Sequence, residues 1–227
     1  MAISKVILGD CIEVMKGFED NRFDLAVVDP PYGINESGQT NKTRGKLAIA
    51  KDYGNKNWDF NSPGKEYYTE LFRVSKNQII WGANHFISKI PFDSSCWIVW
   101  DKVNGENDFA DCELAWTSFK TAVRQVRFMW HGFMQGADFT GRMQGNKKLN
   151  DHRIHPTQKP IKLYEWILKN YAKEGDLILD THLGSGSSRI AADKAGLDFT
   201  GIEIDPEYFA ASCKRFDNYK LQLNLFP

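Results

Sequence analysis

A short apolar run is followed directly by an aspartate and two prolines in the stretch Leu25-Ala26-Val27-Val28-Asp29-Pro30-Pro31-Tyr32. The apolar run, with its β-branched valines, predicts a buried strand of a parallel sheet. The two prolines end that strand, because neither can donate a hydrogen bond to a neighbouring strand and each fixes its own φ. A carboxylate, a backbone carbonyl and an aromatic ring are therefore expected at the carboxyl end of a strand, where open α/β sheets bind their ligands.

Asp29 and Pro30 together suit one reaction, the methylation of an exocyclic amine on a nucleobase. The carboxylate and the carbonyl can each accept one N–H of the amine. Both hydrogen bonds strengthen as the attacking nitrogen becomes tetrahedral and positive. The ring of Tyr32 would stack on the base. For this tetrapeptide alone, a Pro-Pro turn with a capping aspartate remains an equal alternative.

The second half of the chain contains a pattern typical of a nucleotide-like cofactor site. The predicted strand Leu177-Ile178-Leu179-Asp180 leads into a glycine-containing turn, 181–188, and an alanine-rich helix. Such a turn lets a ligand approach the backbone and the free N–H groups of a helix start. The third glycine of the dinucleotide fingerprint is replaced by Arg189. The next predicted strand ends at Glu203, about 20 residues after the turn, as recognition of ribose hydroxyls requires.

Three blocks in this order, Asp-Pro-Pro-Tyr at 29–32, His-Pro-Thr-Gln-Lys-Pro at 155–160 and Asp-x-x-x-Gly-Ser-Gly at 180–186, carry a specific resemblance. The chain resembles the permuted (β-group) DNA amino-methyltransferases, which use S-adenosylmethionine. The likeness covers nearly the whole chain and is weakest over 35–58 and 133–153. Where that family usually has Asp-Pro-Phe before the glycines, this chain has Asp180-Thr181-His182, a variant similar to that of phage and prophage methylases.

The resemblance implies a catalytic site and a cofactor site. The catalytic residues are Asp29, Pro30, Pro31 and Tyr32. The residues implied for the cofactor are Asp10, His155, Thr157, Gln158, Lys159, Asp180, His182, Gly184, Ser185, Gly186, Ser187 and Glu203. Asp10 is expected near the adenine amino group of the cofactor, with an N-cap role for the helix after it as the alternative. Lys159 is expected to bind the cofactor's carboxylate, or else to be an ordinary surface lysine.

Two polar segments are candidates for contact with DNA. The loop 33–59, beside Asp29, is long for a compact domain and is expected to act as a flap that closes on phosphates through Lys42, Arg44 and Lys46. The alternative is a solvated loop with surface lysines. In similar enzymes the target-recognition segment precedes the histidine of the second block. This places it at 133–153, with Arg142, Lys147 and Lys148, and its shortness allows a second subunit to contribute as a homodimer.

Length and composition limit the number of domains and the class of protein. A chain of 227 residues with 42% hydrophobic content can bury one sizeable core, and we expect one methyltransferase domain over 1–227. The formal net charge of +0 leaves DNA binding to local basic patches. The four cysteines show no metal spacing and predict reduced core thiols in a cytoplasmic protein, with no metal site. No signal peptide or apolar run long enough to span a membrane is present.

The order of the blocks predicts an α/β fold, a Rossmann-like methyltransferase fold with a mostly parallel sheet and circularly permuted motifs. The chain should begin at the middle of this sheet with the strand before Asp10, pass through the catalytic strand and return to the strands of Asp180 and Glu203. The predicted activity is methyl transfer from S-adenosylmethionine to adenine N6 of a flipped-out base in DNA, of the kind found in restriction–modification systems and phages. The alternatives are cytosine N4 as acceptor, a catalytically silent DNA-binding regulator and a nicotinamide-dependent oxidoreductase.

Overall fold

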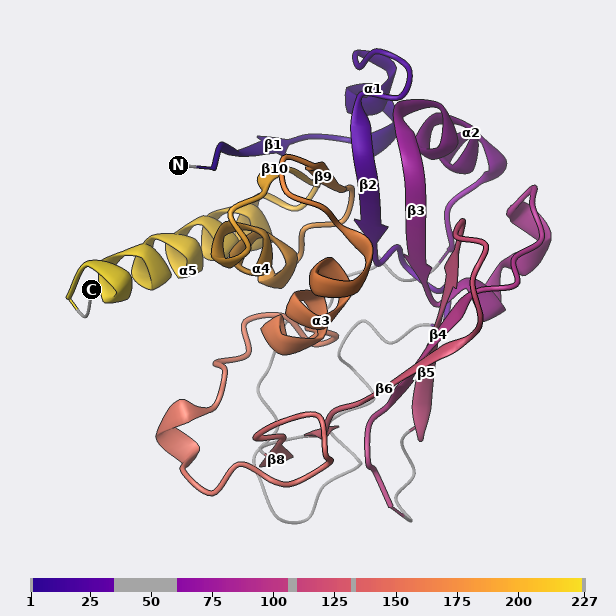
Figure 1. The fold of residues 1–227 in the computed structure, drawn as a ribbon. Coiled ribbons are helices and arrows are strands. Elements are labelled where there is room, and N and C mark those ends of the chain that lie inside the picture. The colour runs from indigo at the N-terminus through magenta and orange to yellow at the C-terminus, as the bar shows by residue number, and fades with distance from the viewer. Residues whose placement is uncertain (1, 35–60, 106–109, 132–133, 226–227) are drawn as a thin grey trace.

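The computed structural model describes residues 2–34, 61–105, 110–131 and 134–225. These residues form an α/β fold around an eight-stranded sheet, with a short two-stranded ribbon apart from it (Figure 1). The strands are β1 (Ser4–Leu8), β2 (Phe23–Val28), β3 (Ser75–Trp81), β4 (Trp97–Asp101), β5 (Cys112–Thr117), β6 (Arg124–Arg127), β7 (Trp130–His131), β8 (Met134–Gln135), β9 (Leu177–Asp180) and β10 (Asp198–Glu203). The α-helices are α1 (Cys11–Lys16), α2 (Lys65–Val74), α3 (Ile161–Tyr171), α4 (Ser187–Lys194) and α5 (Pro206–Leu225).

The sheet is mostly parallel, as the sequence predicts. Its strand order in the described chain is β1-β10-β9-β2-β3-β5-β4-β6. Only the pairings of β5 with β3 and β4 are antiparallel. Because β2, β9 and β10 run parallel, the chain after each of them leaves from the same edge of the sheet. The catalytic block and the cofactor block therefore meet there although they lie far apart in the sequence.

The catalytic strand β2 lies in the interior of the sheet, between β9 and β3. Its side chains alternate between two cores. Leu25 and Val27 pack in the core that includes side chains of α3 and α4, while Ala26 and Val28 pack in the core that includes side chains of α1 and α2. Helices thus cover both faces of the sheet, which is why β2 is an uninterrupted apolar run rather than an alternating one.

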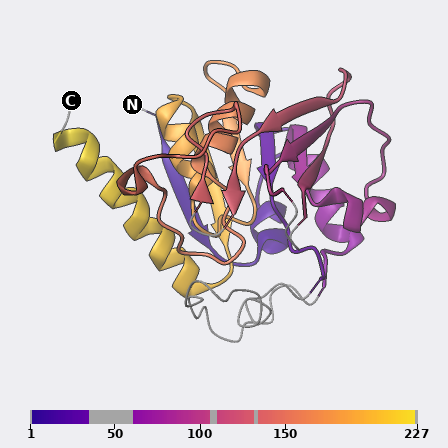
Figure 2. The same ribbon diagram turned by 90° about the horizontal axis from the view of Figure 1, so that it is seen from below.

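The position predicted for the first strand is wrong. β1 lies at the edge of the sheet and pairs only with β10 among the described strands, not in the middle. Its burial pattern fits an edge: no residue of β1 is fully buried, and Leu8 is exposed. Figures 1 and 2 both show α5 on this β1 side of the molecule. Strand order depends on which apolar faces the helices cover, and the sequence before Asp10 carries no such information.

Two further predictions need comment. All four cysteines are free thiols, but only Cys96 is buried. Cys11 and Cys213 are partly exposed and Cys112 is exposed, so the expected core position is wrong for these three. The flap residues Lys42, Arg44 and Lys46 lie outside the described residues, as does most of the loop 33–59. Their proposed contact with DNA stays a prediction.

Candidate active site

A cavity of about 320 Å³ opens where the catalytic and cofactor blocks meet. Its described walls come from five parts of the chain, 9–11, 29–31, 155–164, 181–187 and 203–208. The lining residues are Gly9, Asp10, Cys11, Asp29, Pro31, His155, Thr157, Gln158, Lys159, Tyr164, Thr181, His182, Leu183, Gly184, Ser185, Ser187, Glu203, Ile204, Asp205 and Tyr208. Most of the predicted site residues in the described chain are in this set. Pro30, Tyr32, Asp180 and Gly186 do not line the cavity but adjoin residues that do.

Asp29 stands one residue beyond the end of β2, and one of its two carboxylate oxygens is already engaged. Oδ1 accepts from the ammonium of Lys159 at 2.5 Å and from the hydroxyl of Tyr32 at 2.8 Å. No described group donates to Oδ2. One oxygen is thus fixed by the protein, and the other is available to an incoming N–H donor.

Lys159 also contacts a second carboxylate. Its ammonium lies 3.1 Å from Oε2 of Glu113, and Oε1 of Glu113 pairs with Lys102. Two lysines and two carboxylates therefore form one balanced cluster beside the cavity. Burial raises the pKa of Asp29 above its usual value against the opposing effect of Lys159, whereas the two lysines hold the pKa of Glu113 at about 2 despite its burial.

The structure thus gives Lys159 a partner that the sequence analysis did not expect. The side chain is only 5% exposed, so it is not the surface lysine of the alternative interpretation. Its ammonium faces the catalytic carboxylate, although Lys159 also lines the cavity. Contact with a cofactor carboxylate stays a prediction.

Tyr32 is held on several sides. Its ring stacks on His85, with centroids 5.2 Å apart and planes 16° from parallel. Gly82, at φ +67°, leaves the space that the ring occupies: a Cβ there would lie 2.1 Å from the ring carbon Cε1. Tyr32 is thus positioned beside Asp29 by packing, and its stacking on a target base stays a prediction.

The glycine turn, 181–188, contains two glycines whose φ is positive. Gly184 and Gly186 have φ of +50° and +72°, which side chains with a Cβ rarely adopt. Glu203 accepts from the N–H of Gly184 at 2.8 Å and from that of Asp205 at 2.9 Å. Its carboxylate oxygens retain further lone pairs toward the cavity that Glu203 lines.

Asp180 and His182 support this turn from within. The Asp180 carboxylate accepts from the Ser188 hydroxyl at 2.5 Å and from the N–H of His182 at 3.0 Å, and burial raises its pKa to about 7. The His182 ring packs edge-on against Tyr67, and burial lowers its pKa to about 4, so it is neutral near pH 7. His182 occupies the aromatic position of the usual family pattern with another aromatic ring.

Asp10 serves the N-cap role that the sequence analysis gave as the alternative. Its Oδ1 accepts from the N–H groups of Ile12 and Glu13, at 2.8 and 3.3 Å. Asp10 also lines the cavity. Since the cap uses Oδ1, the contact with the cofactor that is predicted for Asp10 would be made by Oδ2.

In the second block, Gln158 is buried and also lines the cavity, and its contact with the cofactor stays a prediction. Its side-chain amide accepts from the N–H of Ile154 and donates to the carbonyl of His152, so it fixes the chain that leads into the cavity. The His155 ring contacts Tyr208, and its Nδ1 lies 3.2 Å from the Thr157 hydroxyl. The block thus presents His155 and Thr157 to the cavity and directs Lys159 to Asp29.

The described part of the predicted recognition segment has its basic side chains on the surface. Arg142, Lys147 and Lys148 are all exposed, and Arg142 forms an ion pair with Asp138 at 2.8 Å. Arg215 of α5 forms two hydrogen bonds with the Asp151 carboxylate and donates to the Ser185 carbonyl, so it ties this segment to the glycine turn. Binding of DNA by the three basic residues stays a prediction.

Sequence reasoning missed Glu113 and Lys102, and it assigned no role to Gly82. Glu113 was noted only as part of a strand. An acid among the apolar residues of a predicted strand, Glu113-Leu114-Ala115-Trp116, is the signal that could have marked it, since such an acid needs a cation nearby when it is partly buried.

Two structural features are absent from the part of the chain that the structure describes. None of its helices is both long and apolar enough to cross a membrane. Nor does this part contain a group of three or more His, Cys, Asp or Glu side chains arranged to hold a metal ion.

Comparison with known proteins gives consistent matches. A family model described as DNA methylase, of the N6/N4 type, matches residues 91–214. The Type II methyltransferase M2.MboI of Moraxella bovis is 28% identical, over 92% of this chain and 85% of its own length. The Type II methyltransferase M.HpaI of Haemophilus parainfluenzae is 27% identical, over 94% of this chain and 74% of its own.

Solved structures share the fold. The M1.HpyAVI–SAM complex has a TM-score of 0.58 and 22% identity, over 94% of this chain and 100% of that chain. The PvuII DNA methyltransferase, described as cytosine-N4-specific, has a TM-score of 0.56 and 17% identity, over 95% of this chain and 87% of that one. The predicted methyltransferase fold is confirmed. The family match favours it over the nicotinamide-dependent oxidoreductase.

Proposed function

Because this chain belongs to the N6/N4 family of DNA methylases, we propose that it transfers the methyl group of S-adenosylmethionine to N6 of an adenine flipped out of duplex DNA. The observation that carries the proposal is Asp29, which lines the cavity with Oδ1 held by Lys159 and Tyr32, while no described group donates to Oδ2. Its place one residue before Pro30 puts a carboxylate and a carbonyl acceptor within one short segment. The adjoining Pro31 lines the same cavity.

The cavity suits S-adenosylmethionine, which has a sulfonium cation, ribose hydroxyls and an adenine ring. The described residues that line it include one lysine, Lys159, and four carboxylates: Asp10, Asp29, Glu203 and Asp205. An acidic lining favours a cationic ligand. Glu203, fixed by two backbone N–H groups, would hold the ribose hydroxyls, and the open turn at Gly184 would admit the rest of the molecule. Bound there, the cofactor supplies an electrophilic methyl group.

The protein's own contribution is to hold the amine and stabilise its charge. Oδ2 of Asp29 and the carbonyl of Pro30 would accept the two N–H groups of the adenine amine. Both interactions strengthen as the nitrogen gains positive charge, so they stabilise the transition state more than the bound substrate. A paired base cannot reach these acceptors, which is why the base must leave the duplex first.

The order of the sequence blocks and the similar proteins support proposals about the subgroup, the origin and the DNA contacts. The catalytic block precedes the cofactor block, which supports placement in the permuted group. The Asp180-Thr181-His182 variant and the similarity to Type II methyltransferases support a phage or restriction–modification origin. The substrate would be DNA in a bacterial or phage-infected cell, contacted by the flap over 33–59 and by the segment 133–153 of one methyltransferase domain, with a second subunit completing recognition if the protein is a homodimer. A silent DNA-binding regulator is disfavoured because Asp29 and Tyr32 are intact and hydrogen-bonded to each other.

The direct test is methyl transfer from labelled S-adenosylmethionine to duplex DNA of mixed sequence, followed by nucleoside analysis. We expect label in N6-methyladenine. Label in N4-methylcytosine would keep the enzyme class and overturn the choice of base. Absence of label in DNA, with cofactor bound, would overturn the proposed function.

Replacing Glu203 should weaken cofactor binding. Glu203→Ala removes the proposed ribose contact and releases the N–H groups of Gly184 and Asp205, at a cost of about 2 kcal/mol in binding. Glu203→Gln, which keeps one acceptor oxygen, should cost less. Calorimetric titration with S-adenosylmethionine measures both. Equal affinity in the parent and both variants would contradict the placement of the ribose.

A further inference from the structure

We propose that Glu113 is a positioning residue for methyl transfer: by taking a share of the Lys159 charge, it leaves Asp29 with the negative charge that the reacting amine requires. The inference rests on the proposed function and names a residue outside all three sequence blocks. Glu113 does not line the cavity, so it acts through Lys159 and not on the substrate.

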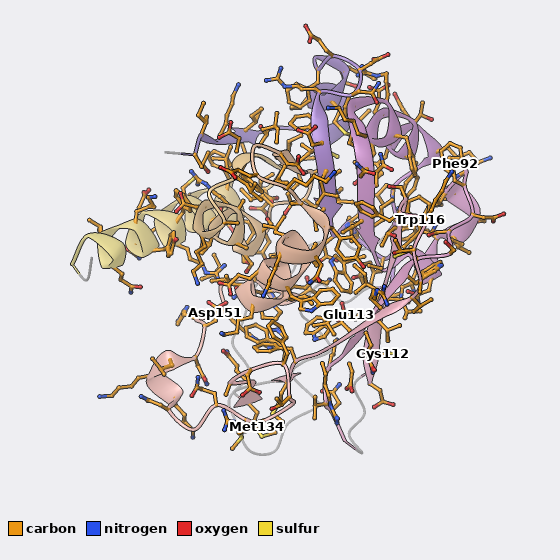
Figure 3. All side chains as sticks on the ribbon, in the orientation of Figure 1. Phe92, Cys112, Glu113, Trp116, Met134 and Asp151 are labelled. Atoms are coloured by element: carbon orange, nitrogen blue, oxygen red, sulfur yellow. The ribbon has the colours of Figure 1, made fainter. Side chains whose placement is uncertain are left out.

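The geometry places Lys159 between two carboxylates. Its ammonium is 2.5 Å from Oδ1 of Asp29 and 3.1 Å from Oε2 of Glu113. The same Oε2 lies 3.5 Å from the Tyr32 hydroxyl. Figure 3 shows Glu113 beyond the carboxyl ends of β2 and β3, on the side of β5 toward α3. Since β5 pairs antiparallel with β3, the first residues of β5 arrive at the edge where β2 and β3 end.

Charge balance explains why Asp29 needs this second carboxylate. Lys159 is 5% exposed, and a lysine so buried requires an anion. If Asp29 were the sole anion, its charge would neutralise only Lys159. Lys102 would then leave the cluster positive while the amine nitrogen also gains positive charge. Glu113 pairs with both Lys102 and Lys159, so the two carboxylates offset the two lysines and the cluster does not oppose the positive charge that develops on the nitrogen.

Lys159 has a positioning role as well. With the Tyr32 hydroxyl, it holds Oδ1 and so fixes the rotation of the Asp29 carboxylate. The remaining oxygen, Oδ2, is then held in one orientation in which it would accept from the amine. A carboxylate free to rotate would lose part of this preorganisation.

The acidity of Asp29 gives the proposal a measurable signature. Lys159 and Tyr32 lower its pKa, Glu113 raises it, and Asp180 on β9 and Tyr164 on α3 also face it electrostatically. The reaction requires ionised Asp29. Loss of the Glu113 charge should lower this pKa, and loss of the Lys159 charge should raise it.

The test compares Glu113→Gln, Lys159→Met and the double variant in single-turnover methyl transfer at saturating cofactor and DNA, across pH. Glu113→Gln should reduce the plateau rate by on the order of tenfold or more and move the acid limb of the profile to lower pH. Lys159→Met should move the acid limb to higher pH. The double variant removes one charge of each sign, so its acid limb should lie between those of the two single variants.

Glu165→Gln is the matched control. Glu165 lies on α3 and forms an ion pair with Lys194 of α4, and both side chains are about one-third or more exposed. Removing this carboxylate should leave rate and profile unchanged. Calorimetric binding of S-adenosylmethionine should be the same in Glu113→Gln and the parent, because the proposed role lies in the chemical step. Thermal unfolding of each variant establishes that the compared proteins are folded.

The outcomes separate this inference from the proposed function. A parent protein that transfers no methyl group to DNA would overturn the proposed function itself. If the parent is active, a Glu113→Gln profile that keeps its acid limb in place would overturn the positioning role alone, whatever the fall in rate. Should the double variant fail to fold, the opposite shifts of the two single variants still decide.

Discussion

Asp29→Ala should abolish methyl transfer, and Asp29→Asn should lower the single-turnover rate by about two orders of magnitude or more, which corresponds to on the order of 3 kcal/mol. Asn keeps nearly the same shape and one acceptor oxygen but loses the charge that faces the reacting nitrogen. Binding of DNA should weaken much less than the rate, since the charge matters most in the transition state.

The measurement is transfer of labelled methyl groups in a single turnover, followed by nucleoside analysis. Cofactor affinity and thermal unfolding are measured in parallel, because Asp29 is also a partner of buried Lys159. Glu113 remains as the second partner of that lysine, so the variants are expected to fold. Robust transfer by Asp29→Ala would defeat the proposed mechanism.

Gly82→Ala should also cause a large loss of activity, although Gly82 bears no functional group. A Cβ at this position would lie 2.1 Å from Cε1 of Tyr32, so the ring must move. Displacement of the ring breaks the hydrogen bond from Tyr32 to Asp29 and the stacking on His85. We expect the rate to fall by on the order of a hundredfold, the same order as the loss of an active-site donor.

Gly175→Ala provides the matched control for backbone strain. Gly175 has φ of +85°, comparable with the +67° of Gly82, but a Cβ there meets nothing within 4 Å. Both variants should lose about 1 kcal/mol or more of stability from the left-handed backbone. Only Gly82→Ala should lose activity, and neither should lose cofactor affinity. An equal effect of the two variants on the rate would show that contact with Tyr32 does not matter.

Local sequence patterns specify the strands and turns that carry the site. Apolar runs ending in Asp29, Asp180 and Glu203 are strands in the structure, and the chain beyond them forms one cavity. These features are local: a buried parallel strand is a continuous apolar run, paired prolines stop it, and glycines open the turn before a helix. The same local reasoning identified Asp10 as an N-cap candidate, and the structure confirms it.

Which charged side chains come into contact depends on the tertiary structure. Lys159 and Asp29 are 130 positions apart, and Tyr32 and Glu113 are 81 apart. Their contact depends on strand order and on the antiparallel register of β5 against β3, which no short window of sequence specifies. The edge position of β1 was missed for the same reason. A strand can be predicted from the spacing of its own apolar residues. The partner of a buried lysine depends on which carboxylates of other elements lie next to it in the fold.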